Sequence, residues 1–173
     1  MMILEEKGYT PEKFIYKIMI NTAYGCRCAY VGIQEDFNLV QKYHVLDPML
    51  AKYKYKTLYD FDVHGGLTYI GLDNYIIGSE NPLYFGFDTG HGGDAIIPLS
   101  ELTTILKKSS LSDDVIKKII TQYKPIKLNY NPIKVNKRGI KNNAVYRDLN
   151  FVKNECFKLS KQIKEINDAI ETR

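Results

Sequence analysis

The sequence of 173 residues lacks tryptophan altogether and contains only three cysteines and three histidines. The cysteines, Cys26, Cys28 and Cys156, form no CxxC pair and are too few for a disulfide framework, which favours a reducing, cytoplasmic location. No run of about 18 apolar residues is present, so no membrane-spanning helix is expected. The segment MMILEEKGYTPEK lacks a basic start followed by an apolar run, so no signal peptide is expected either.

Acidic residues are absent between positions 124 and 147, although the whole chain has a net charge of only +4. Clustered cations attract phosphates, so this asymmetry favours an anionic partner; a solvated basic loop is the other interpretation. The basic residues of this arm are Lys124, Lys127, Lys134, Lys137, Arg138, Lys141 and Arg147.

The overall composition is that of an ordinary globular chain, with 45% apolar and 25% charged residues. We therefore expect a single domain over 1–173, large enough to bury a core. Its three parts are a β-rich part at 1–98, helices and the basic arm at 99–146, and a long C-terminal helix at 147–171.

Hydrophobic patterning predicts an α+β fold, with a mostly antiparallel sheet of about four strands, helices on one face and a long C-terminal helix. Segment 34–60 is ambiguous between a short helix and a tyrosine-rich connection. Ser100 and Ser112 are candidate N-caps of the first two helices after Pro98. Strands are expected at 13–20, 26–33, 63–72 and 82–88, and helices at 99–108, 112–123 and from about 147 to 170.

The last helix carries apolar residues at alternating steps of three and four, as in a heptad repeat. One interpretation is a stripe packed on the sheet. The other is a helix that also pairs with a second copy and builds a homo-oligomer, since about 24 residues extend roughly 36 Å. The stripe consists of Leu149, Val152, Cys156, Leu159, Ile163, Ile166 and Ile170.

Two related phrases, DVHGG at 62–66 and DTGHGGD at 88–94, contain two of the three histidines. On a strand, Asp62 and His64 would project to one face. Gly65 and Gly66 would let a ligand or another backbone approach closely. If the two strands are adjacent, one edge of the sheet would gather five polar residues. They are Asp62, His64, Asp88, His91 and Asp94.

These residue types suit several kinds of site. His and carboxylates can bind zinc or manganese, although the spacing matches no standard metal motif and no cofactor is expected. Two histidines, each oriented by an aspartate, can exchange protons with a phosphodiester. Carboxylates and glycine N–H groups can bind ribose and phosphate, with rings from Tyr69, Tyr84, Phe85 and Phe87 stacking on a base. The polar side chains can also simply satisfy turn backbones. His44 has no such surroundings.

The order CRCAYVGI, DVHGGLTY, FGFDTGHGGD and RDLNFVKNECFKLSKQI resembles a family of small proteins found in phages and mobile elements. The resemblance covers about 14–96 and 147–162. It implies a host-cell cytoplasmic setting in which many small proteins counter host defence. The positions that it marks are Gly32, His64, Gly65, Gly66, Asp88, His91, Asp94, Arg147 and Glu155.

We therefore expect a counter-defence protein that binds and sequesters a small nucleotide immune signal, such as a cyclic dinucleotide or an ADP-ribose derivative. Asp62 or Asp88 would bind ribose hydroxyls, and Arg147 would neutralise phosphate. The alternative is a phosphodiesterase that uses His64 and His91 as base and acid. A third interpretation is an inhibitor that binds nucleic acid or protein through the basic arm. The scattered placement of the basic residues in this arm disfavours it. The expected ligand site is Asp62, His64, Gly65, Gly66, Tyr69, Asp88, His91, Asp94 and Arg147.

Overall fold

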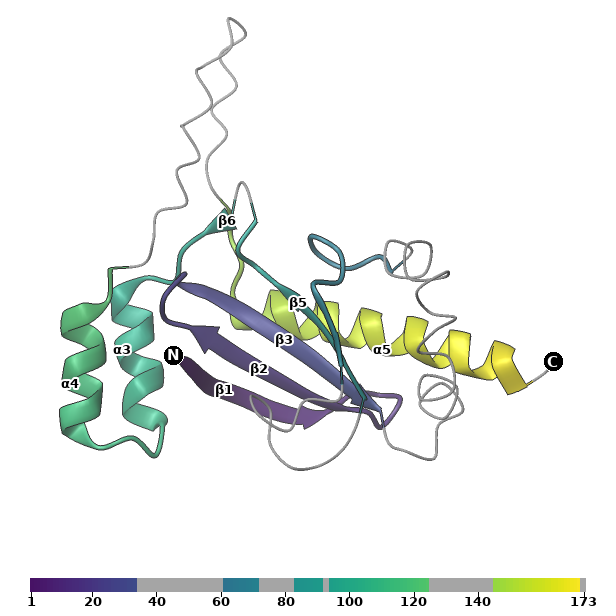
Figure 1. Ribbon diagram of the computed structural model, residues 1–173, viewed down its shortest axis with the longest axis horizontal. Helices are drawn as coiled ribbons and strands as arrows, with labels where there is room; N and C mark the ends of the chain where they lie inside the picture. The colour runs from purple at the N-terminus through teal and green to yellow at the C-terminus, as the bar shows by residue number, and fades with distance from the viewer. Residues whose placement is uncertain (34–60, 72–82, 92–93, 125–144, 172–173) are drawn as a thin grey trace, which may run out of the picture.

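A five-stranded antiparallel sheet forms the centre of the computed structural model, which describes residues 1–33, 61–71, 83–91, 94–124 and 145–171 (Figure 1). In spatial order its strands are β1 (Met2–Tyr9), β2 (Ile15–Asn21), β3 (Cys26–Ile33), β5 (Leu83–Asp88) and β4 (Tyr69–Gly71). A short parallel pair joins β6 (Asp94–Ala95) to β7 (Val145–Tyr146). The expected α+β class is confirmed.

The central strands lie where apolar patterning predicted them. β3 has the predicted bounds 26–33, and every residue in it is buried. The turn before it contains Gly25 with a φ of 66°, a conformation that glycine adopts without strain. Strand β1 was not expected, because it contains charged residues and forms the exposed edge of the sheet beside β2. Its register shifts between Leu4 and Glu6.

The expected strand at 63–72 is wrong over most of its length, because only Tyr69–Gly71 pairs in the sheet. Gly65 and Gly66 have φ values of 70° and 80°, which interrupt the extended backbone. The N–H of Gly66 donates to the carbonyl of Val63 at 2.9 Å and closes a turn. His64 therefore lies in a tight turn that precedes β4.

Helix α5 (Leu149–Glu171) crosses one face of the sheet (Figure 1). Its stripe packs on the sheet as one interpretation predicted: Val152, Cys156, Leu159 and Ile163 are fully buried against strand residues that include Ile18 and Phe85. The side chain of Ile170 lies outside the described residues. Since the stripe is covered within the chain, it gives no support to a homo-oligomer, which stays a prediction.

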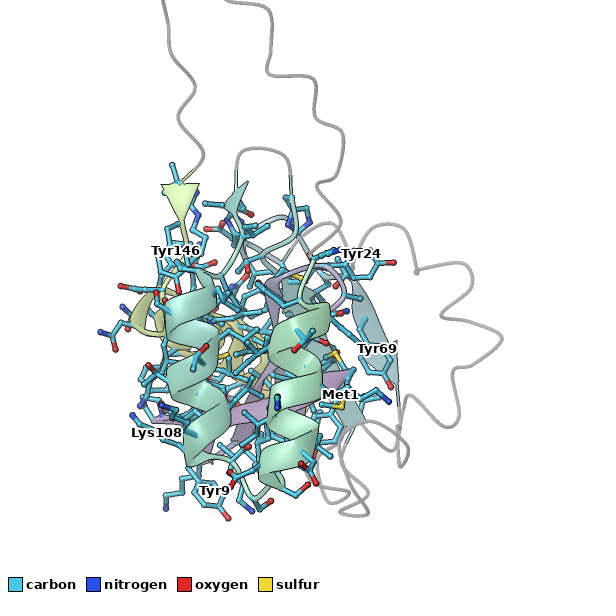
Figure 2. The ribbon with its side chains drawn as sticks, turned by 90° about the vertical axis from the view of Figure 1, so that its left-hand side faces the viewer. Met1, Tyr9, Tyr24, Tyr69, Lys108 and Tyr146 are labelled. Atoms are coloured by element: carbon cyan, nitrogen blue, oxygen red, sulfur yellow. The ribbon has the colours of Figure 1, made fainter. Side chains whose placement is uncertain are left out.

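Two further helices, α3 (Leu99–Lys108) and α4 (Asp113–Gln122), lie side by side at one end of the sheet (Figures 1 and 2). Leu102 and Leu106 of α3 pack on Ile3 and Ile20, and Ile20 shares its face of the sheet with Ile18 beneath α5. Helices α3 and α5 therefore pack on the same face of the sheet, whereas α4 packs beside α3 at the end of the sheet. Within the described residues, no helix has the length and apolar character to cross a membrane.

The helix starts differ in detail from the predictions. Pro98, and not Ser100, occupies the N-cap position of α3. Ser112 is the N-cap of α4 but makes no side-chain capping hydrogen bond. The long helix begins at Leu149 and not at Arg147, because the carboxylate of Asp148 accepts the N–H of Phe151 at 2.7 Å and caps the first turn.

Candidate functional site

The two His-Gly-Gly phrases meet in space. The rings of His64 and His91 lie edge to face, with their centroids 5.6 Å apart and an interplanar angle of 85°. His64 belongs to the turn before β4, and His91 belongs to the turn after β5, the strand beside it. The pairing of β4 with β5 therefore brings together two histidines that are 27 positions apart in the sequence.

Asp94 connects this histidine pair to the C-terminal part of the chain. Its Oδ2 lies 2.6 Å from Nε2 of His64, and its Oδ1 accepts the Nε–H of Arg147 at 3.0 Å. The carboxylate is only 4% exposed, so both contacts are largely shielded from water. The parallel pairing of Asp94 with Val145 places Arg147, two residues further on, beside the carboxylate.

His91 has fewer partners than His64. Its Nδ1 lies 3.7 Å from Oδ1 of Asp88, within ion-pair range but too far for a hydrogen bond. The Nδ1 atom is buried, and it makes no hydrogen bond within the described chain. Asp88 Oδ1 instead accepts the N–H of Gly90 at 2.8 Å. The His91 ring is therefore held in place but retains unused hydrogen-bonding capacity.

Helix α5 supports the site through two side chains. Oε2 of Glu155 accepts the backbone N–H of His64 at 2.7 Å. The ring of Phe151 lies edge to face with His64 at 5.4 Å, and the guanidinium of Arg147 lies over the same ring at 4.6 Å. The family resemblance marked Glu155 as an important position, whereas the sequence analysis did not identify Phe151 as a site residue. Phe151 and Glu155 lie four residues apart on α5 and so share one side of the helix, while Arg147, just before the helix, reaches the Phe151 ring.

The two glycines after His64 differ in their surroundings. A Cβ on Gly65 would lie 2.1 Å from the His91 ring, so only glycine allows His91 to approach this closely. A Cβ on Gly66 would meet no atom of the described residues within 4 Å. Gly65 is therefore part of the contact between the phrases, whereas Gly66 contributes to the turn.

Two expected site residues are not part of this cluster, which corrects the sequence-based prediction. Asp62 does not share a strand face with His64; its side chain is 82% exposed and lies 2.9 Å from Nζ of Lys158. Tyr69 contacts Tyr30 edge to face at 5.7 Å, on the sheet face opposite α5.

The other predicted rings also lie away from the histidines. Tyr84 packs with Tyr69 on that opposite face, and Phe85 and Phe87 pack in the core beneath α5. Gly92, Gly93, His44 and the basic arm at 125–144 lie outside the described residues.

A second polar cluster, also missed by the sequence reasoning, lies next to the first. Arg27 of β3 is fully buried, and all five of its N–H donors are used. Burial alone would lower the pKa of Arg27, but the hydrogen bonds to Glu5 and Tyr146 raise it above its usual value. The donors of Arg27 bind the carboxylates of Glu5 and Glu101, the hydroxyl of Tyr146 and the carbonyl of Arg147.

The carbonyl contact joins the two clusters, because Arg27 Nη1 donates to Arg147 at 3.0 Å and so fixes the backbone of a site residue. Figure 2 shows Tyr146 of this second cluster beside the start of α3. The signal in the sequence was a single arginine inside an otherwise uncharged, buried strand, because a charge in that position requires several partners.

The candidate site therefore consists of His64, His91, Asp94 and Arg147, with Asp88, Glu155, Phe151 and Gly65 around them. It combines two imidazoles, a shielded carboxylate and a guanidinium, a set that can bind anions, transfer protons or bind a metal ion. Comparisons with protein-family models, with curated proteins and with solved structures find no match. The resemblance to a phage family therefore stays a prediction.

Proposed function

We propose that the protein binds a phosphate-bearing, nucleotide-like ligand at the His64–His91–Asp94–Arg147 site and, in a phage setting, withholds that ligand from host defence. The observation that carries this proposal is the arrangement of Arg147. Asp94 binds its Nε, and within the described residues the two terminal amino groups have no hydrogen-bond partner. Such a guanidinium can bind two phosphate oxygens at once.

Preorganisation of Arg147 supports the same proposal. Its side chain is 27% exposed, stacks over Phe151, and extends from a backbone whose carbonyl is bound by Arg27. A cation that is already oriented loses less conformational entropy when an anion binds. The partly exposed imidazoles of His64 and His91 lie next to it and offer further donors to phosphate or base.

The positions of the expected ligand residues in the structure decide which of them we assign to the ligand. Asp62 and Tyr69 lie away from the cluster, so we assign neither to the ligand. Asp88 is the carboxylate beside His91 that could accept ribose hydroxyls, and its side chain is 29% exposed. The aromatic surface beside the site is Phe151, already covered by Arg147 on one side.

A second candidate function is metal-free hydrolysis of a phosphodiester, favoured by the contact of 2.6 Å between His64 and Asp94. An aspartate at this distance holds an imidazole in a fixed orientation, as a general base requires. His64 would take a proton from the attacking water, and His91 would give a proton to the leaving oxygen. The bond from phosphorus to the leaving oxygen would break as the bond to water oxygen forms.

One experiment separates these functions. The purified chain is incubated with a panel of cyclic dinucleotides and ADP-ribose derivatives, with and without EDTA, and is then heated to release bound compounds for chromatography. Sequestration predicts depletion of one compound that returns unchanged after heating. Hydrolysis predicts a new product. Failure to deplete any compound would contradict both.

Matched variants assign the result to the site. Arg147→Met should strongly reduce depletion, because it removes the phosphate-binding cation while its backbone carbonyl still accepts from Arg27. Lys158→Met is the control, since it removes a cation of α5 that pairs with exposed Asp62 outside the cluster. Equal losses in both variants would point to non-specific electrostatic binding.

A further inference from the structure

We infer that His64, His91 and Asp94 form a binding site for one divalent transition-metal ion of the zinc class. One ring nitrogen of each histidine and one carboxylate oxygen of Asp94 lie within 4.8 Å of one another. Two imidazoles and a carboxylate are ligands that zinc prefers. This inference does not depend on the nucleotide ligand proposed above, because metal binding can be measured alone.

The distances are close to those that a metal ion requires. Ligands bound to zinc at about 2.0–2.1 Å in a tetrahedral arrangement lie roughly 3.3 Å from each other. His64 Nε2 and Asp94 Oδ2, now 2.6 Å apart, would therefore separate by less than about 1 Å. The ion would replace the proton that they share. The His91 nitrogen, which lies within 4.8 Å of the other two ligand atoms, would close the remaining gap by a side-chain rotation.

Asp88 supplies the kind of outer carboxylate that often stands behind a metal-binding histidine. It lies 3.7 Å from Nδ1 of His91, and this buried nitrogen makes no hydrogen bond in the described chain. Metal-binding histidines usually direct one nitrogen to a carboxylate or carbonyl and the other to the metal. In this arrangement Nδ1 faces Asp88, and Nε2 is the ligand.

The surroundings of the other two ligands fit the same role. Arg147 binds Oδ1 of Asp94, which leaves Oδ2 for the ion. Glu155 binds the backbone N–H of His64, and Phe151 contacts its ring. Three protein ligands leave the fourth position open, which is typical of zinc sites that bind water or a substrate oxygen. Arg147 would then lie beside an oxygen anion bound at that position.

The test measures metal binding by the full chain. The protein is stripped with EDTA, dialysed and titrated with Zn²⁺ against a chromophoric chelator, and the visible spectrum of Co²⁺ is recorded in parallel. We expect one equivalent of tightly bound ion and a Co²⁺ spectrum of nitrogen and oxygen ligands. Sulfur-to-cobalt charge-transfer bands would instead assign the ion to Cys26 and Cys28 and would overturn the inference.

Variants locate the ion. His64→Ala, His91→Ala and Asp94→Asn should each weaken Zn²⁺ binding by more than about 100-fold, because even outer-shell changes weaken metal sites about 10- to 100-fold. Asp88→Asn, an outer-shell change, should weaken Zn²⁺ binding by only about 10- to 100-fold. His44→Ala, which removes the third histidine, should leave affinity unchanged. Circular dichroism of each variant checks folding, and Asp88→Asn keeps the test decisive if a ligand variant fails to fold.

Two outcomes would contradict the inference. In the first, the unmodified chain binds no Zn²⁺. In the second, the His64→Ala variant binds Zn²⁺ as tightly as the unmodified chain. Depletion of a nucleotide by the EDTA-stripped chain would leave the proposed function standing even in that case. Conversely, Zn²⁺ binding without any nucleotide depletion would support the metal site alone.

Discussion

Two polar clusters lie next to each other in this protein and are built in opposite ways. Around Arg27, a fully buried guanidinium has a partner for every donor, supplied by β1, α3, β7 and the residue after β7. Around His64 and His91, the rings are 18% and 32% exposed, and the buried Nδ1 of His91 has no hydrogen-bond partner among the described residues. Arg147 belongs to both, through its carbonyl in one and its side chain in the other.

The difference separates a structural role from a binding role. A buried charge whose partners are all protein groups leaves nothing for a ligand, and its value lies in holding distant segments together. A partly exposed cluster with unused donors can bind something from solution. The first cluster therefore positions the backbone on which the second depends.

The largest expected effect is on stability, from Arg27→Met. This change leaves the Glu5 carboxylate, only 5% exposed, without its cation. We expect a loss of about 3–5 kcal/mol in the free energy of unfolding, measured with urea. Arg147→Met is the matched control and should lose about 1 kcal/mol, since His64 still binds Asp94. Similar losses for the two variants would remove the distinction between the clusters.

The next effect is on ligand binding. Here Arg147→Met should cause a larger loss than Arg27→Met, the reverse of their effects on stability. Arg147→Met should weaken binding of whichever nucleotide the panel identifies by about 10- to 100-fold, the value of one charge-assisted hydrogen-bonding group. Isothermal titration calorimetry measures the change. Thermal unfolding of the same sample establishes that the variant is folded. A loss below about twofold would separate Arg147 from the ligand.

A smaller effect should distinguish the neighbouring glycines. Gly65→Ala and Gly66→Ala both place a side chain at positive φ, so each should lose about 1 kcal/mol of stability. Only Gly65→Ala also displaces the His91 ring, 2.1 Å from the new Cβ. We expect it alone to weaken Zn²⁺ and nucleotide binding. Equal binding by the two variants would show that His91 does not need its present position.

The smallest effect concerns alkaline pH and belongs to the Arg27 cluster. Burial, followed by the hydrogen bond to Glu101, raises the pKa of the Tyr146 hydroxyl to about 12. The folded state thus favours the neutral phenol, so its stabilisation is complete below the unfolded pKa of about 10 and falls as pH rises towards 12.

The corresponding measurement compares urea unfolding of the unmodified chain and of Tyr146→Phe across this pH range. The difference between them should shrink with pH by less than about 1.4 kcal/mol per unit, because the hydroxyl is only partly buried. A difference that stays constant from pH 10 to 12 would contradict the raised pKa.

Much of the fold could be predicted because long apolar patterns report burial directly. β3 occupies its predicted range, and the stripe of α5 packs on the sheet. Strand β1 was not predicted, since an edge strand exposes charged residues and loses the apolar signal. Residues 63–68 were misassigned to a strand because the positive φ values of Gly65 and Gly66 outweighed the apolar residues around them.

The site was predicted in part. The repeated His-Gly-Gly phrases identified His64, His91 and Asp94, because rare residue types among glycines are a local signal. Asp62 was assigned to the site by counting along a strand that does not exist there, and Tyr69 was assigned because its ring is near in sequence, although β4 directs it to the opposite sheet face. Arg27 was overlooked because its partners come from segments up to 120 positions away.

The sequence by itself determined the identities and periodicities: which segments are apolar enough to become β2, β3, β5 and α5, and which short phrases contain the histidines. Only the tertiary structure decided which polar side chains meet. Asp94 contacts His64 across 30 positions and Arg147 across 53. Such pairs depend on strand order and on the docking of α5, and these follow from burial of the whole core and not from any local pattern.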